Sequence, residues 1–377
     1  MNIPIEIYQI ILSYTDFLTQ IRIRQTNKIL YTHLEINDFT LRNLKEEKYI
    51  NILTDKILKV YPFITELNVN HNPLVTNLNH LTKLKILHAK YKDCGVGDSG
   101  ISNLDLTELY INHNGKITDL NHMTKLCTLE IGKDFPSDNC IGNDGIINLN
   151  LSKLIIHFSH TITNINHMTN LEELSIGHTL IGDNEISNLR NLIKLNVRDN
   201  PKITYINHLT KLQILNASNK CGIGDNGIKN LQLKKIKCSN NPKITNLNHM
   251  FATLDILHAN DNFDLGGIGD NGISELNLVD LRTCDNTNIT KLNHMTRLKV
   301  LDAKGNSGIT DKSISNLDLI ELYAYDNPNI TNVTHMTNLQ VLDARGNCGI
   351  GLNGIANLKL KNIYAWNNPR ITQKLSR

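Results

Sequence analysis

The amino-acid sequence predicts an α/β solenoid with a parallel, concave β-sheet, preceded by a small all-α domain. Three observations lead to this prediction: a six-residue phrase recurs fifteen times, its period stays near 21 residues, and an asparagine often follows it at a fixed distance. A fixed period of this length indicates one structural unit stacked many times. Because each unit contacts only its neighbours, the array forms one elongated body whatever its length.

The recurring phrase is an aliphatic residue, two variable residues, Leu or Ile, one variable residue and a smaller apolar residue. In one copy Leu301 and Ala303 alternate with polar positions, which is the period of a strand with one buried face, while Leu298 enters the same core from the preceding turn. We call the stretch that begins with each phrase a rung. The rungs start at Ile64, Leu84, Leu106, Leu126, Leu151, Leu171, Leu192, Leu212, Leu233, Leu254, Leu278, Leu298, Leu319, Leu339 and Leu360.

An asparagine stands eight positions after the start of ten rungs. A buried amide at this position can hydrogen-bond to backbone groups of its own loop and of a neighbouring rung, which solvent cannot reach. We therefore expect a ladder of buried asparagines along the solenoid. The ten residues are Asn72, Asn114, Asn200, Asn241, Asn262, Asn286, Asn306, Asn327, Asn347 and Asn368.

This pattern resembles the leucine-rich repeat, L-x-x-L-x-L-x-x-N. The resemblance covers about 310 of the 377 residues. It implies a leucine-rich-repeat horseshoe of about 15 repeats over residues 63–377, with the parallel sheet on its concave side. Rungs of 20 to 25 residues leave room only for short 3₁₀ or extended segments on the convex side.

The rungs alternate between two types, with a joint period of 41 to 45 residues. Gly rungs carry motifs such as Gly95-x-Gly97-x-x-Gly100, which match a dinucleotide-binding fingerprint. A true fingerprint occurs once, at the first strand of a βαβ unit, whereas this motif recurs in register with the repeat. We therefore expect the glycines to supply positive φ in tight loops rather than to bind a phosphate.

His rungs carry Leu/Ile-Asn-His-Leu/Met-Thr or a close variant. Like positions two rungs apart are separated by about 10 Å, whereas a Zn–N bond is about 2.0–2.1 Å long. One metal ion cannot bridge them, so we expect each histidine to hydrogen-bond to a neighbouring loop. The seven histidines are His80, His122, His167, His208, His249, His294 and His335.

Composition excludes several classes of function. A net charge of +3 argues against a general nucleic-acid binder. The N-terminus lacks the features of a signal peptide, and no apolar run is long enough for a membrane helix. The seven cysteines are scattered without a CxxC, which indicates a reducing compartment: the cytoplasm, with the nucleus as an alternative. Because no nucleophile or paired-carboxylate motif stands out from the repeat, we expect neither an enzyme nor a cofactor.

The first sixty residues follow another pattern. Ile7, Ile10, Ile11 and Tyr14 have the spacing of an amphipathic helix, and Leu41–Val60 is expected to form one longer helix. We expect a helical domain over residues 1–40 and a linker or capping helix over 41–62.

The segment Ile3-Pro4-x-Glu6-Ile7-x-x-x-Ile11-x-x-Tyr14-x-Asp16-Phe17-Leu18 is similar to an F-box. It departs from the family at Tyr14-Thr15 and at Leu30-Tyr31. The resemblance implies a Skp-type adaptor of a cullin–RING ubiquitin ligase as partner. The adaptor-binding residues would be Ile3, Pro4, Ile7, Ile11 and Leu18.

An F-box followed by leucine-rich repeats resembles the substrate receptors of these ligases, in which the repeats hold the target protein. The whole chain, with its Asn, Ile and Lys bias, is similar to F-box/leucine-rich-repeat proteins of giant DNA viruses, which implies the host cytoplasm. The alternative is an interaction scaffold without a ligase role, whose N-terminal helices only cap the first rung. A secreted repeat protein of pathogen type is a third possibility, disfavoured by the N-terminal sequence.

The register of the repeat identifies the concave residues. The chain is 5% aromatic, yet four aromatic residues gather near its C-terminal end beside charged groups, and aromatic residues with Arg are typical of binding hot spots. An alternative is that these aromatics cover the end of the solenoid. A basic middle strip of Lys194, Arg198, Lys235, Lys237 and Arg282 favours an acidic segment of the target. The expected target-binding residues are Arg282, Asp302, Tyr323, Tyr325, Asp343, Arg345, Tyr364 and Trp366.

Overall fold

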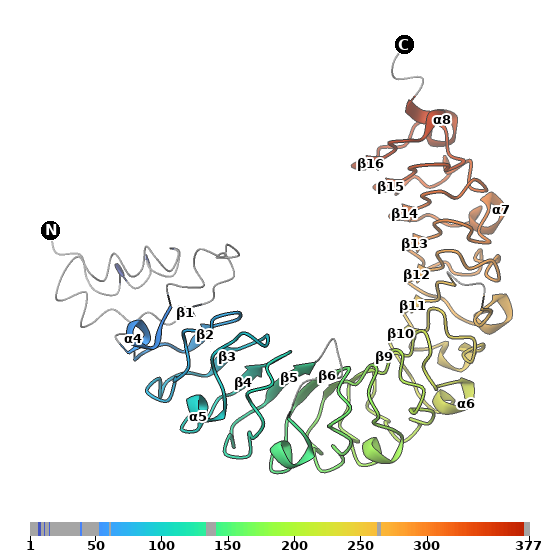
Figure 1. Ribbon diagram of the computed structural model, residues 1–377. Helices are drawn as coiled ribbons and strands as arrows, with labels where there is room; N and C mark the ends of the chain where they lie inside the picture. The colour runs from blue at the N-terminus through green and yellow to red at the C-terminus, as the bar shows by residue number, and fades with distance from the viewer. Residues whose placement is uncertain are drawn as a thin grey trace. The chain divides into compact units, whose positions relative to one another are not determined.

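The computed structural model describes residues 53–59, 62–132, 141–261 and 265–372, together with positions 7, 8, 11, 15, 38 and 39 (Figure 1). The chain divides into two compact units, Met1–Ser175 with Thr179–Ile181 and Ile176–His178 with Gly182–Arg377. In each unit the strands are parallel and follow one another in chain order. The predicted parallel-sheet solenoid is therefore confirmed.

Every rung contributes one short strand, formed by the residues around the second aliphatic of the phrase. The strands of the first unit are β1 (Asp38–Phe39), β2 (Glu66–Asn68), β3 (Ile86–His88), β4 (Glu108–Tyr110), β5 (Thr128–Gly132), β6 (Lys153–His157) and β7 (Glu173–Ser175). The strands of the second unit are β8 (Lys194–Asn196), β9 (Ile214–Asn216), β10 (Lys235–Lys237), β11 (Ile256–His258), β12 (Asp280–Arg282), β13 (Val300–Asp302), β14 (Glu321–Tyr323), β15 (Val341–Asp343) and β16 (Asn362–Tyr364).

Strand β1 was not predicted from the sequence. It pairs with β2, placing Phe39 opposite Leu67, so the sheet begins one strand before the first recognisable rung. No leucine-rich phrase precedes it, which is why the repeat pattern could not reveal this strand.

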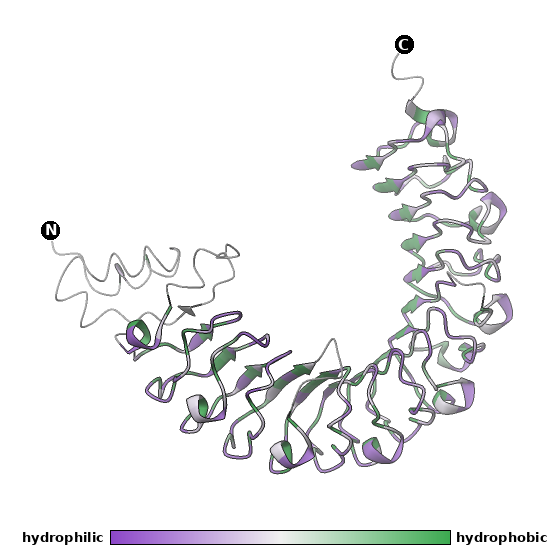
Figure 2. Cartoon of the chain, in the orientation of Figure 1, coloured by the Kyte–Doolittle hydropathy of each residue, from purple (hydrophilic) through white to green (hydrophobic). Residues whose placement is uncertain are grey.

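The core lies behind the sheet and follows the aliphatic positions of the phrase. Leu298, Leu301 and Ala303 are all buried, and the leucines of neighbouring strands pair in register, as Leu301 does with Leu322. Burying a leucine side chain stabilises the fold by roughly 1.5–3 kcal/mol. Figure 2 shows hydrophobic residues alternating with hydrophilic ones along the strands and loops, as this one-sided burial requires.

Short helical turns lie between the strands or after the last one, on the side away from the strands (Figure 1). They are α4 (Asp55–Leu58), α5 (Asp98–Ile101), η3 (Asn143–Ile146), η4 (Asn184–Ile186), α6 (Asp225–Ile228), η5 (Asn248–Met250), η6 (Asp270–Gly272), α7 (Asp311–Ile314), η7 (Leu352–Ile355) and α8 (Pro369–Thr372). Their lengths of three or four residues confirm the short segments expected from the rung length.

The helix expected over Leu41–Val60 does not include Leu53 and Thr54, and residues 41–52 and Val60 lie outside the described residues. Helix α4 begins only at Asp55, because the hydroxyl of Thr54 accepts a hydrogen bond from the backbone N–H of Ile57 at 3.3 Å and caps it. Leu53 lies before the cap, is buried, and offers its carbonyl to Asn72.

The buried asparagine ladder is present in most His rungs and in the last rung, which starts at Leu360, and the described Gly rungs lack it. Asn286 is typical: its Nδ2 donates to the carbonyls of Ala259 and Ile268 in the preceding rung, at 2.8 and 3.1 Å, and its Oδ1 accepts from the N–H of Asn288. The same arrangement, complete or in part, recurs at Asn72, Asn114, Asn200, Asn241, Asn327 and Asn368.

The prediction was wrong for two of the ten asparagines. Asn306 and Asn347 are exposed, and the buried position in their Gly rungs falls one residue later, at Ser307 and Cys348. The loop of a Gly rung is thus displaced by one residue relative to that of a His rung. A tenth asparagine, Asn262, lies outside the described residues.

The Asn-His pair of each His rung reaches toward both neighbouring rungs. His249 contacts the carbonyl of Ile228 in the preceding rung through Nε2 at 3.1 Å, as expected. Its neighbour Asn248 donates to the carbonyl of Asn271 in the following rung at 2.8 Å and accepts from the N–H of Glu275. His122, His167, His208, His294 and His335 make the same backward contact. His80, in the first rung, has no partner for Nε2 in the described part of the chain.

The glycines of the Gly rungs are loop residues, as expected, but for a different reason. Of the three in one motif, Gly267, Gly269 and Gly272, only Gly267 has positive φ. A Cβ atom at Gly272 would instead overlap the carbonyl oxygen of Thr245 in the preceding rung, and Gly100, Gly227 and Gly354 are equally confined. These glycines therefore permit the close approach of two backbones.

The aspartate that follows the glycines links each Gly rung to the next His rung. Asp270 accepts hydrogen bonds from the hydroxyl and the N–H of Thr290, at 2.6 and 2.7 Å, and from the N–H of Lys291. Burial opposes ionisation of Asp270, but these hydrogen bonds and the Lys291 charge bring its pKa below the ordinary value. Asp98, Asp183, Asp225 and Asp311 repeat the arrangement.

Candidate protein-interaction surface

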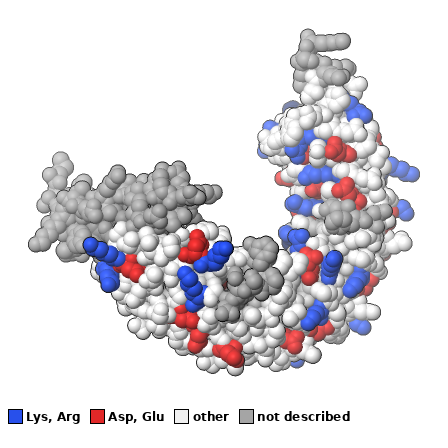
Figure 3. Space-filling view, viewed as in Figure 1, with Lys and Arg blue, Asp and Glu red and all other residues white. Residues whose placement is uncertain are grey.

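The sheet face opposite the core carries the side chains on either side of each buried leucine. Because the strands pair in register, these side chains form rows that run across the strands. One row of the second unit follows the third residue of β8 to β16: Asn196, Asn216, Lys237, His258, Arg282, Asp302, Tyr323, Asp343 and Tyr364. Figure 3 shows Lys and Arg interspersed with Asp and Glu along this part of the chain.

Three residues gather near the end of this face, and we call them the C-terminal aromatic patch: Tyr325, Arg345 and Trp366. The Arg345 guanidinium carbon lies 5.1 Å from the ring centroid of Tyr325 and 4.8 Å from that of Trp366. Each cation–π contact of this kind contributes about 0.5–1 kcal/mol at an exposed site. Arg345 therefore fixes two aromatic side chains from the neighbouring rungs on either side.

Asp343 orients the Arg345 side chain of the patch through two hydrogen bonds. Its two carboxylate oxygens accept from Nε and Nη2 of Arg345, both at 2.7 Å, and the side chain of Asp343 is almost completely buried. A bidentate pair restricts the guanidinium to one plane. Trp366 remains 58% exposed and Tyr364 47% exposed, so the apolar part of this surface is open to solvent.

Tyr323, Asp302 and Arg282 lie in the same row but in separate interactions. The Tyr323 hydroxyl donates to Glu321 at 2.7 Å, and this hydrogen bond, together with burial, raises the pKa of Tyr323 to about 12. Lys304 pairs with Asp302 at 3.3 Å and lies over the Tyr323 ring. Arg282 pairs with Asp280. The eight predicted residues thus share one face without forming one cluster.

Sequence reasoning missed the partners Asp280 and Glu321. Both stand two positions before a predicted residue of the same strand, Arg282 and Tyr323 respectively. Residues two apart in a strand point to the same side. Pairs such as Asp280 with Arg282 could therefore have been recognised from the strand period alone.

The first unit has a more acidic face. Glu130 accepts hydrogen bonds from Lys90, at 2.9 Å, and from Asn112. The Tyr110 hydroxyl donates to Glu108 at 2.6 Å, and burial with this carboxylate raises the pKa of Tyr110. Lys90 is thus paired with Glu130 and Tyr110 with Glu108, whereas Asn112 Oδ1 is buried without a hydrogen-bond partner among the described residues.

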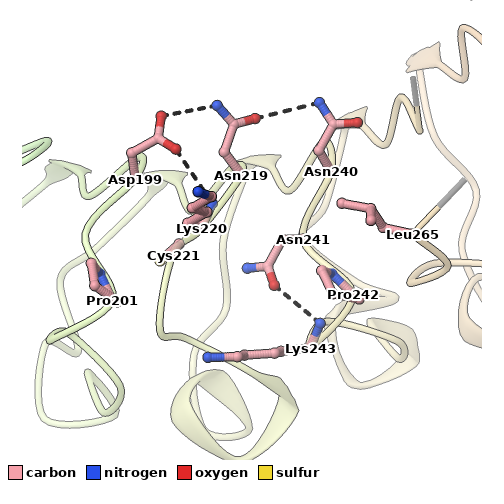
Figure 4. Close-up of a pocket in the computed structure, with 10 residues that line it drawn as sticks. All are labelled: Asp199, Pro201, Asn219, Lys220, Cys221, Asn240, Asn241, Pro242, Lys243 and Leu265. Carbon is pink, nitrogen blue, oxygen red and sulfur yellow. Dashed lines mark hydrogen bonds between the residues drawn. The ribbon is translucent and has the colours of Figure 1, made fainter. Parts of the chain in front are cut away.

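A pocket of about 590 Å³ lies beside the loops that follow β8, β9 and β10 (Figure 4). One rim is a chain of hydrogen bonds from Asn240 to Asn219 to Asp199, three residues in the left-handed conformation that Asn and Asp tolerate. Pro201, Pro242 and Leu265 give the pocket a largely apolar lining. Burial raises the pKa of the Cys221 thiol to about 11, so it is not a thiolate nucleophile at neutral pH.

The other buried thiols have the same character. Burial raises the pKa of Cys94 and of Cys348 to about 11, and that of Cys238 to about 12. Within the described ranges, no group of three or more His, Cys, Asp or Glu side chains is placed to hold a metal ion. None of the helices in the described part of the chain has the length and hydrophobicity that a membrane-spanning segment requires.

Strand β16 is the last in the sheet order of the described residues, and its three side chains are exposed. Ile363 of β16 occupies the register position of the buried leucines, yet 43% of its surface is exposed. Its two neighbours in the strand are exposed as well. Trp366 lies over Arg345 of the preceding rung. The aromatic residues therefore leave this end of the described core accessible.

Two of the five predicted adaptor-binding residues lie in the described part of the chain. Ile7 and Ile11 are helical, four residues apart, and 46% and 41% exposed. Side chains at this spacing lie on one face of a helix. Ile3, Pro4 and Leu18 lie outside the described residues.

Comparison with known proteins supports the fold. No protein-family model and no curated protein matches the sequence. Among solved structures, an internalin from Listeria monocytogenes is similar over 74% of this chain and 86% of its own, with 22% identity and a TM-score of 0.52. TLR13, solved with ssRNA13, is similar over 85% of this chain and 53% of its own, with 18% identity and a TM-score of 0.51. Likeness at this level concerns the fold alone: the chain has the leucine-rich-repeat type of architecture.

Proposed function

We propose that the chain is the substrate-recognition subunit of a cullin–RING ubiquitin ligase. The F-box-like segment docks on a Skp-type adaptor, and the repeats hold the protein to be ubiquitinated. The observation that carries the proposal is the order of the two parts: Ile3-Pro4-x-Glu6-Ile7 and its spaced aliphatics stand directly before a leucine-rich-repeat solenoid. The exposed, helical Ile7 and Ile11 support it, because adaptor docking needs apolar side chains that the chain's own core does not use.

The repeats have a non-catalytic role in this proposal. Their polar signature residues bind neighbouring rungs, and the described thiols with raised pKa values lack nucleophilic character. The C-terminal aromatic patch is the proposed target-binding surface, since Trp366 and Tyr325 are exposed and oriented by Arg345. Exposed aromatic residues with a fixed arginine are the usual anchors of protein interfaces.

Adaptor capture tests the first half of the proposal. The full-length chain should retain a purified Skp-type adaptor, and Pro4→Ala with Ile7→Asp should abolish retention. Ile147→Asp is the matched control, because Ile147 is an exposed isoleucine within the repeats. Absence of adaptor binding by the unaltered chain, under conditions where an established F-box protein binds, would favour the interaction scaffold with a purely capping N-terminus.

Target capture tests the second half. Tyr325→Ala with Trp366→Ala should remove the proteins that the full-length chain enriches from cells, while the circular dichroism spectrum stays unchanged. Phe251→Ala is the control, because Phe251 is a more exposed aromatic residue on a helical turn rather than on the sheet face. Equal loss with both variants, or no loss with either, would exclude the C-terminal aromatic patch as the binding surface.

A further inference from the structure

Three residues form a row across the centre of the exposed sheet in the second unit, and we call them the cationic row: Lys237, His258 and Arg282. Lys237 of β10 is the register partner of His258 of β11, which in turn is the register partner of Arg282 of β12. Adjacent strands lie about 4.8 Å apart. The three basic side chains are therefore immediate neighbours on one face.

Some side chains in and beside the cationic row lack a hydrogen-bond or ion-pair partner among the described residues. The Nε2 atom of His258 is buried and has no hydrogen-bond partner among the described residues. Lys237 and its strand neighbour Lys235 form no ion pair within the described ranges, whereas Arg282 pairs with Asp280 at 3.3 Å. A buried polar atom without a partner costs about 1–3 kcal/mol, and His258 Nε2 is one of three such side-chain atoms among the described residues, with His80 Nε2 and Asn112 Oδ1.

Electrostatics around His258 agree with the geometry. Burial lowers the pKa of His258 to about 4, and the charges of Arg282, Lys235 and Lys237 act in the same direction, opposed only by Asp280. Burial likewise lowers the pKa of Lys237, with Lys235, Arg282 and Arg198 contributing. Three cations therefore surround a neutral imidazole, and only one nearby carboxylate offsets them.

We propose that the cationic row is the docking site for an acidic segment of the partner protein, with one Asp or Glu carboxylate seated over His258. The carboxylate would lie between Lys237 and Arg282, close enough to the His258 ring to stabilise its protonated form. This inference deepens the proposed function by assigning the chemistry of the target, and it rests on that function only in naming the partner as a ligase target.

The extent of the row favours a short acidic segment over a nucleic acid. Asn216 precedes Lys237 and Asp302 follows Arg282 in this register position, so the row itself spans only three strands. Asp302 is buried and paired with Lys304, which prevents the row from continuing. Nucleic-acid sites need cations along many successive phosphates, whereas two or three carboxylates of an extended peptide suffice here.

Binding of a fluorescent tetraglutamate peptide to the full-length chain tests the proposal by anisotropy. The peptide should bind at low salt, and tetraglutamine should not. Lys237→Gln should weaken binding at least fivefold. Lys304→Gln is the control and should change binding less than twofold, because Lys304 is on the same face but is already paired with Asp302. Equal weakening by both variants, or no binding of tetraglutamate, would overturn the assignment.

The pH dependence tests His258 itself. A seated carboxylate raises the pKa of His258, so binding should tighten at least threefold between pH 7.5 and pH 5.5, where glutamate stays ionised. The charged groups that act on His258 from the adjoining strands are Arg282, Lys235, Lys237 and Asp280. His258→Gln should abolish the pH effect; its persistence in that variant would exclude His258 as the seat.

Two further probes identify the class of partner. A peptide with a single phosphoserine and a short single-stranded oligonucleotide should both bind more weakly than tetraglutamate. If the phosphoserine peptide or the oligonucleotide binds more tightly than tetraglutamate, and this binding is lost in Lys237→Gln, that class of molecule is the occupant instead of the acidic segment. These measurements involve no adaptor. Peptide binding without adaptor capture would therefore refute the ligase role and leave the docking site supported. Adaptor capture without peptide binding would refute the docking site and leave the ligase role supported.

Discussion

Asn286 and Asn306 stand at the same position of adjacent rungs, and we expect opposite results when each is replaced by alanine. Asn286 is buried, with 2% of its surface exposed, and its amide makes three hydrogen bonds: to the carbonyls of Ala259 and Ile268 and from the N–H of Asn288. At about 1 kcal/mol for each hydrogen bond, Asn286→Ala should cost about 3 kcal/mol, and more if the two carbonyls stay dry.

Asn306→Ala is the matched control. The side chain of Asn306 is exposed. The hydrogen bond from Asn306 to Asp285, at 2.8 Å, is donated by the backbone N–H, which alanine retains. Its free energy of unfolding should stay within about 0.5 kcal/mol of the unaltered chain.

Urea unfolding followed by circular dichroism measures both variants. Because repeat arrays can unfold in parts, hydrogen exchange at the Asn288 amide provides a local measurement that does not depend on a two-state transition. Exchange at Asn288 should accelerate in Asn286→Ala and not in Asn306→Ala. A cost below about 0.5 kcal/mol for Asn286→Ala, or equal costs for both variants, would refute the assignment of the ladder to His rungs.

Three other predictions concern the contacts between rungs. Gly227→Ala should destabilise the chain by about 1–3 kcal/mol through overlap with the preceding backbone, whereas Gly142→Ala, whose Cβ would lie 3.7 Å from its nearest neighbour, should be tolerated; thermal unfolding compares them. His249→Ala should cost about 1 kcal/mol by urea unfolding, and His80→Ala less, because only His249 has an acceptor among the described residues. The pKa of Asp270 is lowered in the folded chain, so its ionised carboxylate stabilises the fold above the unfolded pKa of about 3.9. This stabilisation is lost as the pH falls through the folded pKa of Asp270. The loss of stability between pH 5 and pH 3 should therefore be smaller in Asp270→Asn than in the unaltered chain.

The apolar register of the fold could be predicted from the sequence because one physical rule fixes it. Leu301 and its equivalents alternate with exposed positions, and no other face of the strand can be buried. The polar positions were less predictable. Asn306 stands at the same distance from the start of its rung as Asn286, and counting from that start alone does not reveal that the loop of its Gly rung is displaced by one residue.

The candidate surface could be predicted only in part. The sheet face and its aromatic residues follow from the register, whereas the stacking of Arg345 between Tyr325 and Trp366 depends on three rungs at once. His258 was missed because its sequence offers no motif; its importance arises from Lys237 and Arg282, which lie 21 residues before it and 24 after it in the chain. The repeat register alone placed Lys237 and Arg282 in one basic strip, but only the structure shows that His258 lies between them with a buried, unpartnered Nε2.

The alternation of rungs also bears on how such a chain can change in length. A His rung meets the preceding Gly rung through its buried asparagine, its histidine and the Asp–Thr contact, and meets the following one through the second asparagine and the confined glycine. Duplication or deletion of a single rung would join two of one kind and leave these groups facing partners of the wrong type. Rungs should therefore be gained or lost as pairs, in steps of 41 to 45 residues. The pair of rungs, rather than the single rung, is the unit that can be duplicated or deleted.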